Sequence, residues 1–200
     1  MKAELATRRP AENPFSGRRI EGLAYRSPDF SWRRLEDRLD GLGRRCAVVG
    51  PRGSGKTTLL EEIACRLEST VAMVRIPGSC DHPLRTARNQ LPRPLTERHA
   101  VLIDGCEQLG AIGWRRLLHE TRRAGALIVT LHQPGRLPTL VECRTDPDLL
   151  RILVQDLAPR EAPHHQDGLD ELFHRHNGNL RLCFRDLYDV FAGRSDPASP

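Results

Sequence analysis

Residues Gly50–Thr57 read GPRGSGKT, the spacing of a glycine, four residues, a second glycine, a lysine and a threonine. The apolar run CAVVG (Cys46–Gly50) leads into this stretch, and Lys56–Glu68 follows with apolar residues at helical spacing. Glycines let the backbone curl so that successive N–H groups point at phosphate oxygens, and a helix that begins here adds the positive end of its dipole. The stretch therefore predicts a strand, a phosphate-binding loop and a helix.

The lysine of this loop is unusual for the chain. There are 31 basic residues, of which only Lys2 and Lys56 are lysines. We expect Lys56 to reach the β- and γ-phosphates of a nucleotide and the Thr57 hydroxyl to ligate Mg²⁺. The planar fork of arginine does not replace a compact ammonium, which explains why a lysine persists here. The alternative is a chance glycine turn between a strand and a helix. The predicted nucleotide-binding residues are Gly50, Pro51, Arg52, Gly53, Ser54, Gly55, Lys56, Thr57 and Thr58.

An acidic residue ends the next strongly apolar strand, His99–Asp104. Downstream of a phosphate loop, Asp104 is predicted to hold Mg²⁺ through water; the alternative is an aspartate that caps a turn with Gly105. Glu107 is a candidate to orient or deprotonate an attacking water, or else a surface glutamate at a helix start. Many ATPases place the catalytic acid directly after the metal-binding aspartate, where this chain has Gly105, so slow hydrolysis or a switch function stays open.

The strand predicted at Ala126–Leu131 ends in polar residues. Ligands of parallel sheets bind beyond the carboxyl ends of the strands. Thr130 is therefore a candidate to contact the γ-phosphate or the attacking water, and His132 is a second candidate. The alternatives are a buried threonine bonded to backbone and a loop histidine.

Strands alternate with helices along the chain, which predicts an α/β fold with a parallel sheet. We expect an N-terminal arm and short helix at 1–43, a core at 44–145, a short helical segment at 146–192 and a disordered tail at 193–200. The first thirty residues are predicted to be irregular. Further strands are predicted at Val71–Ile76 and Leu140–Cys143. Further helices are predicted at Trp32–Leu42, Leu84–Gln90, Trp114–Ala124, Asp148–Leu157, Leu169–His176 and Leu180–Phe191.

Composition narrows the class of protein. No apolar stretch approaches the ~18 residues of a membrane span, and no secretory leader is recognisable, so a cytoplasmic location without a membrane partner is expected. The six cysteines are scattered without a CxxC pair, which argues against a zinc site and favours buried, reduced thiols. The net charge of +5 does not by itself indicate a nucleic-acid partner, because the arginines are spread along the whole chain.

Together, GPRGSGKT, AVLIDGCEQL and ALIVT resemble the additional-strand, catalytic-glutamate group of P-loop ATPases that includes the AAA+ proteins. The resemblance covers roughly residues 44–135. It implies a three-layer fold with sheet order 5-1-4-3-2, ATP and Mg²⁺ as ligands, and Asp104 on the third strand. It also implies ATP hydrolysis coupled to a conformational change, with a homo-oligomer and a nucleic-acid or protein client as expected partners.

The C-terminal segment HNGNLRLCFRDLYDVF is similar to the part of the AAA+ lid in which a helix after a glycine carries a sensor arginine. That similarity places the sensor at Arg181, which is otherwise one more arginine of an arginine-rich chain. The stretch between the fifth predicted strand and Gly178 is too short for a full four-helix lid. No arginine finger can be assigned, because Arg115, Arg116, Arg122 and Arg123 are equivalent candidates.

Three other functions are compatible with a phosphate-binding loop: a GTPase, a small-molecule kinase and an ATP-gated adaptor. A GTPase is disfavoured because a chain with lysines only at positions 2 and 56 has no NKxD-type guanine motif. A small-molecule kinase can have an identical phosphate loop, and other arginines could clamp its substrate. An ATP-gated adaptor with little turnover fits the short lid and the displaced glutamate. The sequence favours ATP hydrolysis, with Lys56, Glu107 and Thr130 as the catalytic candidates.

Overall fold

A computed structural model describes residues 12–27, 30–159 and 166–193 of the chain. These residues form two compact units. Of the described residues, the sheet unit contains 30–51 and Gly55–Cys143. Of the described residues, the helical unit contains 12–27, Arg52–Ser54, 144–159 and 166–193.

The sheet unit is built on five parallel strands in the order β2-β3-β4-β1-β5. The strands are β1 (Arg45–Val49), β2 (Thr70–Arg75), β3 (His99–Asp104), β4 (Ala126–Leu131) and β5 (Thr139–Glu142). The central strands β3 and β4 are apolar on both faces, as buried parallel strands require. The strand order confirms the predicted fold class, a three-layer α/β architecture of the P-loop NTPase type.

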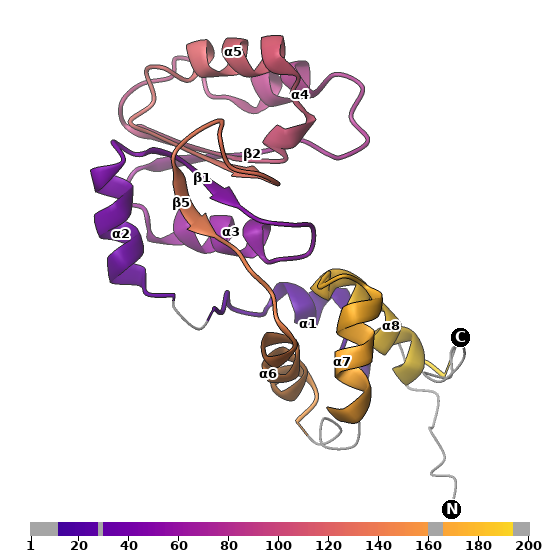
Figure 1. Cartoon of the computed structure of the whole chain (residues 1–200). Coiled ribbons are helices and arrows are strands. Elements are labelled where there is room, and N and C mark those ends of the chain that lie inside the picture. The colour runs from indigo at the N-terminus through magenta and orange to yellow at the C-terminus, as the bar shows by residue number, and fades with distance from the viewer. Residues whose placement is uncertain (1–11, 28–29, 160–165, 194–200) are drawn as a thin grey trace, which may run out of the picture. The chain divides into compact units, whose positions relative to one another are not determined.

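Helices cover both faces of this sheet (Figure 1). On one face, α4 (Pro83–Gln90) and α5 (Ala111–Glu120) pack on strand residues such as Val101 and Val129 through Ala87 and Leu117. On the opposite face, α3 (Lys56–Arg66) contacts β1, β3 and β4 and buries Leu59, Leu60 and Ile63. Helix α2 (Trp32–Gly41) lies against the edge strand β5. Each helix turns one apolar stripe to the sheet, which is the reason for the alternating pattern of the sequence.

The helical unit has a hydrophobic core of its own. It contains α1 (Gly17–Glu21), α6 (Pro147–Leu157), α7 (Gln166–Arg175) and α8 (Leu180–Phe191). Phe15 lies inside this core, with its ring centroid 6.2 Å from that of Phe184 and 5.2 Å from that of Phe191. The Asn13 side chain also donates a hydrogen bond to the Tyr188 carbonyl at 2.9 Å. The described part of the N-terminal arm is thereby tied to the C-terminal helices.

The prediction of an irregular arm was wrong for residues 17–21, which form α1. This helix is only five residues long and buries none of them, so its sequence carries no periodic signal. The rest of the arm before residue 12, and the predicted disordered tail beyond Gly193, lie outside the described residues.

The bounds predicted for α5, Trp114–Ala124, were also wrong. A 3₁₀ turn at Cys106–Gln108 precedes the helix, and Gly110 then caps its start, so it begins three residues before the predicted Trp114. It ends at Glu120, where the Thr121 hydroxyl donates back to the Leu117 carbonyl at 2.9 Å. Every other predicted helix or strand outside the arm has bounds within three residues of those observed.

In the part of the chain that the structure describes, no helix is both long enough and apolar enough to cross a membrane. All six thiols are free. The prediction of buried cysteines is confirmed for Cys46, Cys106, Cys143 and Cys183, but Cys65 is exposed and Cys80 is half-buried. Burial raises the pKa of Cys46 to about 12 and that of Cys183 to about 11, so both thiols stay protonated at neutral pH.

Candidate nucleotide-binding site

The predicted phosphate-binding loop joins the end of β1 to the start of α3. Gly55 is the N-cap of α3 and has a φ of 84°, a left-handed conformation that favours glycine. Lys56 begins the helix and is 8% exposed. Its Nζ donates hydrogen bonds of 2.7 Å to the carbonyls of Gly50 and Pro51. The ammonium thus lies inside the curl of the loop, at the positive end of a helix dipole, where a phosphate is favoured.

Thr57 and Asp104 lie on different elements but are in contact. The Thr57 hydroxyl, in the first turn of α3, donates to Asp104 Oδ2 at 2.8 Å. Asp104 is the last residue of β3, which is separated from β1 by β4 in the sheet. The structure therefore brings together the two side chains that the sequence assigned to the metal.

Thr130 contacts the other oxygen of the same carboxylate. Its hydroxyl donates to Asp104 Oδ1 at 2.6 Å and accepts from the Gly105 N–H at 2.9 Å. Thr130 is 1% exposed and lies near the end of β4. Both oxygens of Asp104 thus accept hydrogen bonds from hydroxyl groups, and a contact of Thr130 with the γ-phosphate or the attacking water stays a prediction.

Gly105 explains why no acid directly follows Asp104. Its φ is 90°, and a Cβ built at this position would lie 2.2 Å from the backbone oxygen of Ile76. A side chain would therefore need a shift of the backbone as well as a strained conformation. The next carboxylate is that of Glu107, which the 3₁₀ turn at Cys106–Gln108 carries back beside the strand ends.

Glu107 pairs with His132, the first residue after β4. The distance between Glu107 Oε1 and His132 Nε2 is 3.2 Å, and the two side chains are 23% and 30% exposed. Glu107 Oε2 is buried and has no hydrogen-bond partner among the described residues. One oxygen of this carboxylate is thus held by the imidazole, and the other is an acceptor without a bond within the described protein.

Burial raises the pKa of the neighbouring Cys106 thiol, with the Glu107 carboxylate adding to the effect. A thiol that stays protonated is a poor nucleophile. The chemistry of this cluster therefore belongs to its oxygen and nitrogen groups.

The donor set fits magnesium. Mg²⁺ prefers hard oxygen ligands and takes one or two from protein side chains, with the rest from phosphate and water. Thr57 and Asp104 supply a hydroxyl and a carboxylate at one point. Among the described residues there is no cluster of three or more His, Cys, Asp or Glu that could form an all-protein metal site. An ion shared with a nucleotide is the kind of site that these residues suit.

Another predicted ligand, Arg181, is an exposed residue of α8 in the helical unit, to which Arg52–Ser54 of the loop also belong. Its contact with a nucleotide stays a prediction. Sequence reasoning did not find the pairing of His132 with Glu107, nor the hydrogen bond from Thr130 to Asp104. His132 was singled out by its place after β4, but only the turn at Cys106–Gln108 shows which group it contacts.

Comparisons with known proteins give a partial match. The chain is similar to the hemin import ATP-binding protein HmuV of Rhodopseudomonas palustris (strain HaA2), with 34% identity over 102 residues. The alignment covers 46% of this chain and 36% of the relative, so the chain spans about a third of the length of that protein. No family model matches the chain. The match agrees with the strand order in pointing to a P-loop NTPase.

Proposed function

We propose that this protein binds ATP with Mg²⁺ and hydrolyses it. The observation that carries the proposal is the hydrogen bond between the Thr57 hydroxyl and Asp104 Oδ2, directly after the phosphate-binding loop. A loop that only made a turn would not need a carboxylate from β3 facing the first turn of its helix. Hydroxyl and carboxylate at this point are the magnesium ligands expected beside a triphosphate.

Each residue of the cluster has a role in the proposed reaction. The backbone N–H groups of the loop and Lys56 bind the phosphates and stabilise the charge of the transition state. Thr57 and Asp104 hold Mg²⁺, which neutralises charge on the phosphate oxygens when bound. Glu107 accepts a proton from the attacking water, while His132 contacts Oε1 at 3.2 Å and so orients the carboxylate. Thr130 keeps Asp104 in place from the side of β4.

The nucleotide is proposed to be ATP because the chain has no guanine-recognition motif and because the similar protein HmuV is named as ATP-binding. Within the P-loop ATPases, the AAA+-like motifs support a nucleotide-driven conformational change that acts on a protein or nucleic-acid partner. A homo-oligomer, a cytoplasmic location and a nucleotide contact of Arg181 belong to the same proposal.

The proposal is tested with ATP labelled in the γ-phosphate. The purified protein should release labelled inorganic phosphate in the presence of Mg²⁺ and lose this activity when EDTA is added. Transfer of the label to a small-molecule acceptor would identify a kinase instead. Tight ATP binding with no release of phosphate, with or without added DNA or protein, would identify an ATP-gated adaptor, the function that the displacement of the acid from position 105 favours.

A further inference from the structure

The two faces of the sheet unit differ in charge. The segments that form α4, α5 and their following loops, residues 83–98 and 111–125, contain eight arginines and two acids, Glu97 and Glu120. The segments that include α2 and α3, residues 32–45 and 56–68, contain seven basic residues and six acids. The positive charge of the sheet unit is thus concentrated on α4, α5 and their loops, which we call the basic face.

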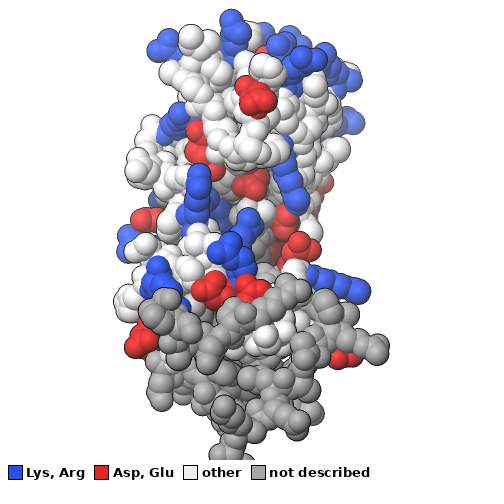
Figure 2. Space-filling view, turned by 90° about the vertical axis from the view of Figure 1, so that its right-hand side faces the viewer, with Lys and Arg blue, Asp and Glu red and all other residues white. Residues whose placement is uncertain are grey.

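Most arginines of the basic face are exposed and carry uncompensated charge. Arg88 is paired with Glu120, with 3.0 Å between Nε and Oε1, and Arg122 contacts His119. The remaining six make no ion pair with an acid anywhere in the described ranges 12–27, 30–159 and 166–193: Arg85, Arg93, Arg98, Arg115, Arg116 and Arg123. Figure 2 shows basic side chains, here all arginines, gathered at the top of the view, where α4 and α5 lie.

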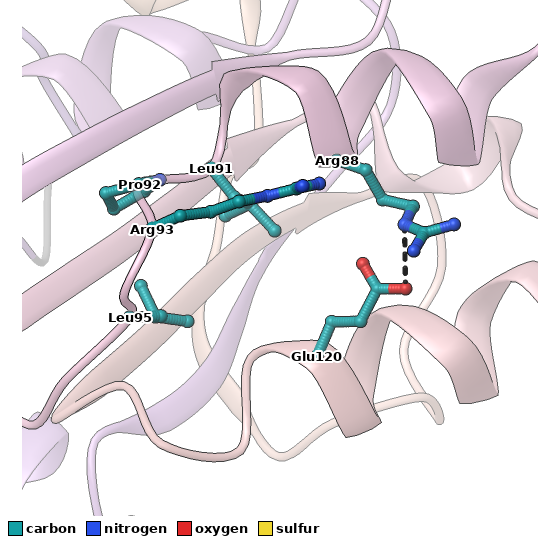
Figure 3. A pocket seen from close by; sticks show the side chains of 6 residues that line it. All are labelled: Arg88, Leu91, Pro92, Arg93, Leu95 and Glu120. Atoms are coloured by element: carbon teal, nitrogen blue, oxygen red, sulfur yellow. Dashed lines mark ion pairs between the residues drawn. The ribbon is translucent and has the colours of Figure 1, made fainter.

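A shallow pocket of about 220 Å³ opens within this face (Figure 3). Leucine and proline side chains of the loop after α4 line it, and Arg93 extends across it. The ion pair between Arg88 and Glu120 closes the other side and links α4 to α5. The acid therefore fixes one arginine and lowers the charge of the face by one.

The basic face offers cations but no stacking surface. Trp114 is the one aromatic residue of its two segments, and it is 8% exposed. Proteins that bind single strands stack bases on exposed aromatic side chains, and this face has none in its described segments. Its guanidinium groups suit phosphate oxygens, to which arginine makes bidentate hydrogen bonds. The ten residues of α5 extend for about 15 Å, the axial rise of roughly four base pairs, so several phosphates are within reach.

We propose that the basic face binds the phosphate backbone of double-stranded nucleic acid, independently of base sequence. The proposal does not rest on ATP hydrolysis, because none of the arginines belongs to the nucleotide-binding cluster. The phosphates of a duplex are regularly spaced along both strands, which suits charges distributed over two helices and two loops. An acidic protein segment would present carboxylates to the same groups, and the experiment below separates the two.

The test measures the fluorescence anisotropy of a labelled 30-base-pair duplex with the full chain, without nucleotide, between 50 and 200 mM NaCl. With about five phosphate contacts, affinity should fall roughly 500-fold over this range. Replacing Arg116 and Arg123 by alanine should weaken binding at least tenfold and reduce the slope of log affinity against log salt by about 1.8. The matched control replaces Arg33 and Arg34 of α2, which are also exposed, and should change affinity less than twofold.

Glu120→Gln should change the affinity for the duplex in the opposite direction to the arginine variants. Unfolding of the variant cannot produce tighter binding. The substitution removes the acid and releases Arg88, so binding should tighten roughly threefold. Equal losses in the two double arginine variants would show that only net charge matters and would overturn the proposal. Displacement of the duplex by poly-glutamate at an equal concentration of charge would assign the face to an acidic protein, and absence of binding at 50 mM NaCl would also overturn it.

Discussion

The phosphate-binding loop and the cluster at the strand ends serve one proposed reaction but are built differently. The loop is eight consecutive residues, Gly50–Thr57, whose conformation follows from glycines and a helix start. The cluster takes Asp104 from the end of β3 and Glu107 from the turn after it, and Thr130 and His132 from the end of β4 and the residue that follows it. The difference teaches that the groups proposed to bind phosphate are placed by local conformation, whereas the groups proposed to act in hydrolysis are placed by strand order. Substitutions in the two regions should therefore separate binding from turnover.

The largest effect is expected in the loop. Lys56→Ala should weaken ATP binding at least 100-fold, about 2.7 kcal/mol, because the ammonium enclosed by the loop is lost. Equilibrium binding of a fluorescent ATP analogue measures the change. Arg66→Ala, at the other end of the same helix, is the control and should bind normally. Undiminished binding by Lys56→Ala would remove the loop as the nucleotide site.

Asp104→Asn should act on turnover instead. The amide is a weaker magnesium ligand, so hydrolysis at saturating ATP should fall roughly 100-fold while ATP affinity changes only a few-fold. Phosphate release measured over a series of Mg²⁺ concentrations should show a requirement for more Mg²⁺. The exposed Asp81→Asn is the control. A loss of ATP affinity as large as that of Lys56→Ala would erase the distinction between the two regions.

Glu107→Gln tests the proposed base. The variant should retain ATP binding and slow hydrolysis at least tenfold, about 1.4 kcal/mol in the barrier, because the amide cannot accept the proton of the attacking water. Single-turnover phosphate release measures this step directly. A rate equal to that of the parent protein excludes Glu107 as the base.

The smallest effect is expected at His132, which acts through Glu107. His132→Gln should slow hydrolysis roughly threefold, about 0.6 kcal/mol, by loosening the held carboxylate. Because the two residues act as one unit, the double variant with Glu107→Gln should be no slower than Glu107→Gln alone. Additive losses would instead give His132 an independent role.

Much of the fold could be predicted because its elements have strong periodic patterns. The buried strands His99–Asp104 and Ala126–Leu131 were predicted with the observed bounds, as was the helix Leu180–Phe191. The start of α5 could not be predicted, since Gly110 and Gly113 are typical of a loop and only packing on the sheet makes this stretch helical. The short helix α1 and the burial of Phe15 among C-terminal residues depend on contacts between distant parts of the chain.

By itself, the sequence determined that a glycine-rich loop joins a strand to a helix, because glycine conformations and helix starts are local properties. It also determined which acid ends the third strand. Tertiary structure decided that Thr57, Asp104 and Thr130 share one network, that Gly105 has no room for a side chain and that His132 holds Glu107. These facts depend on which strands are neighbours and on how a turn packs against Ile76, and no spacing along the chain specifies either.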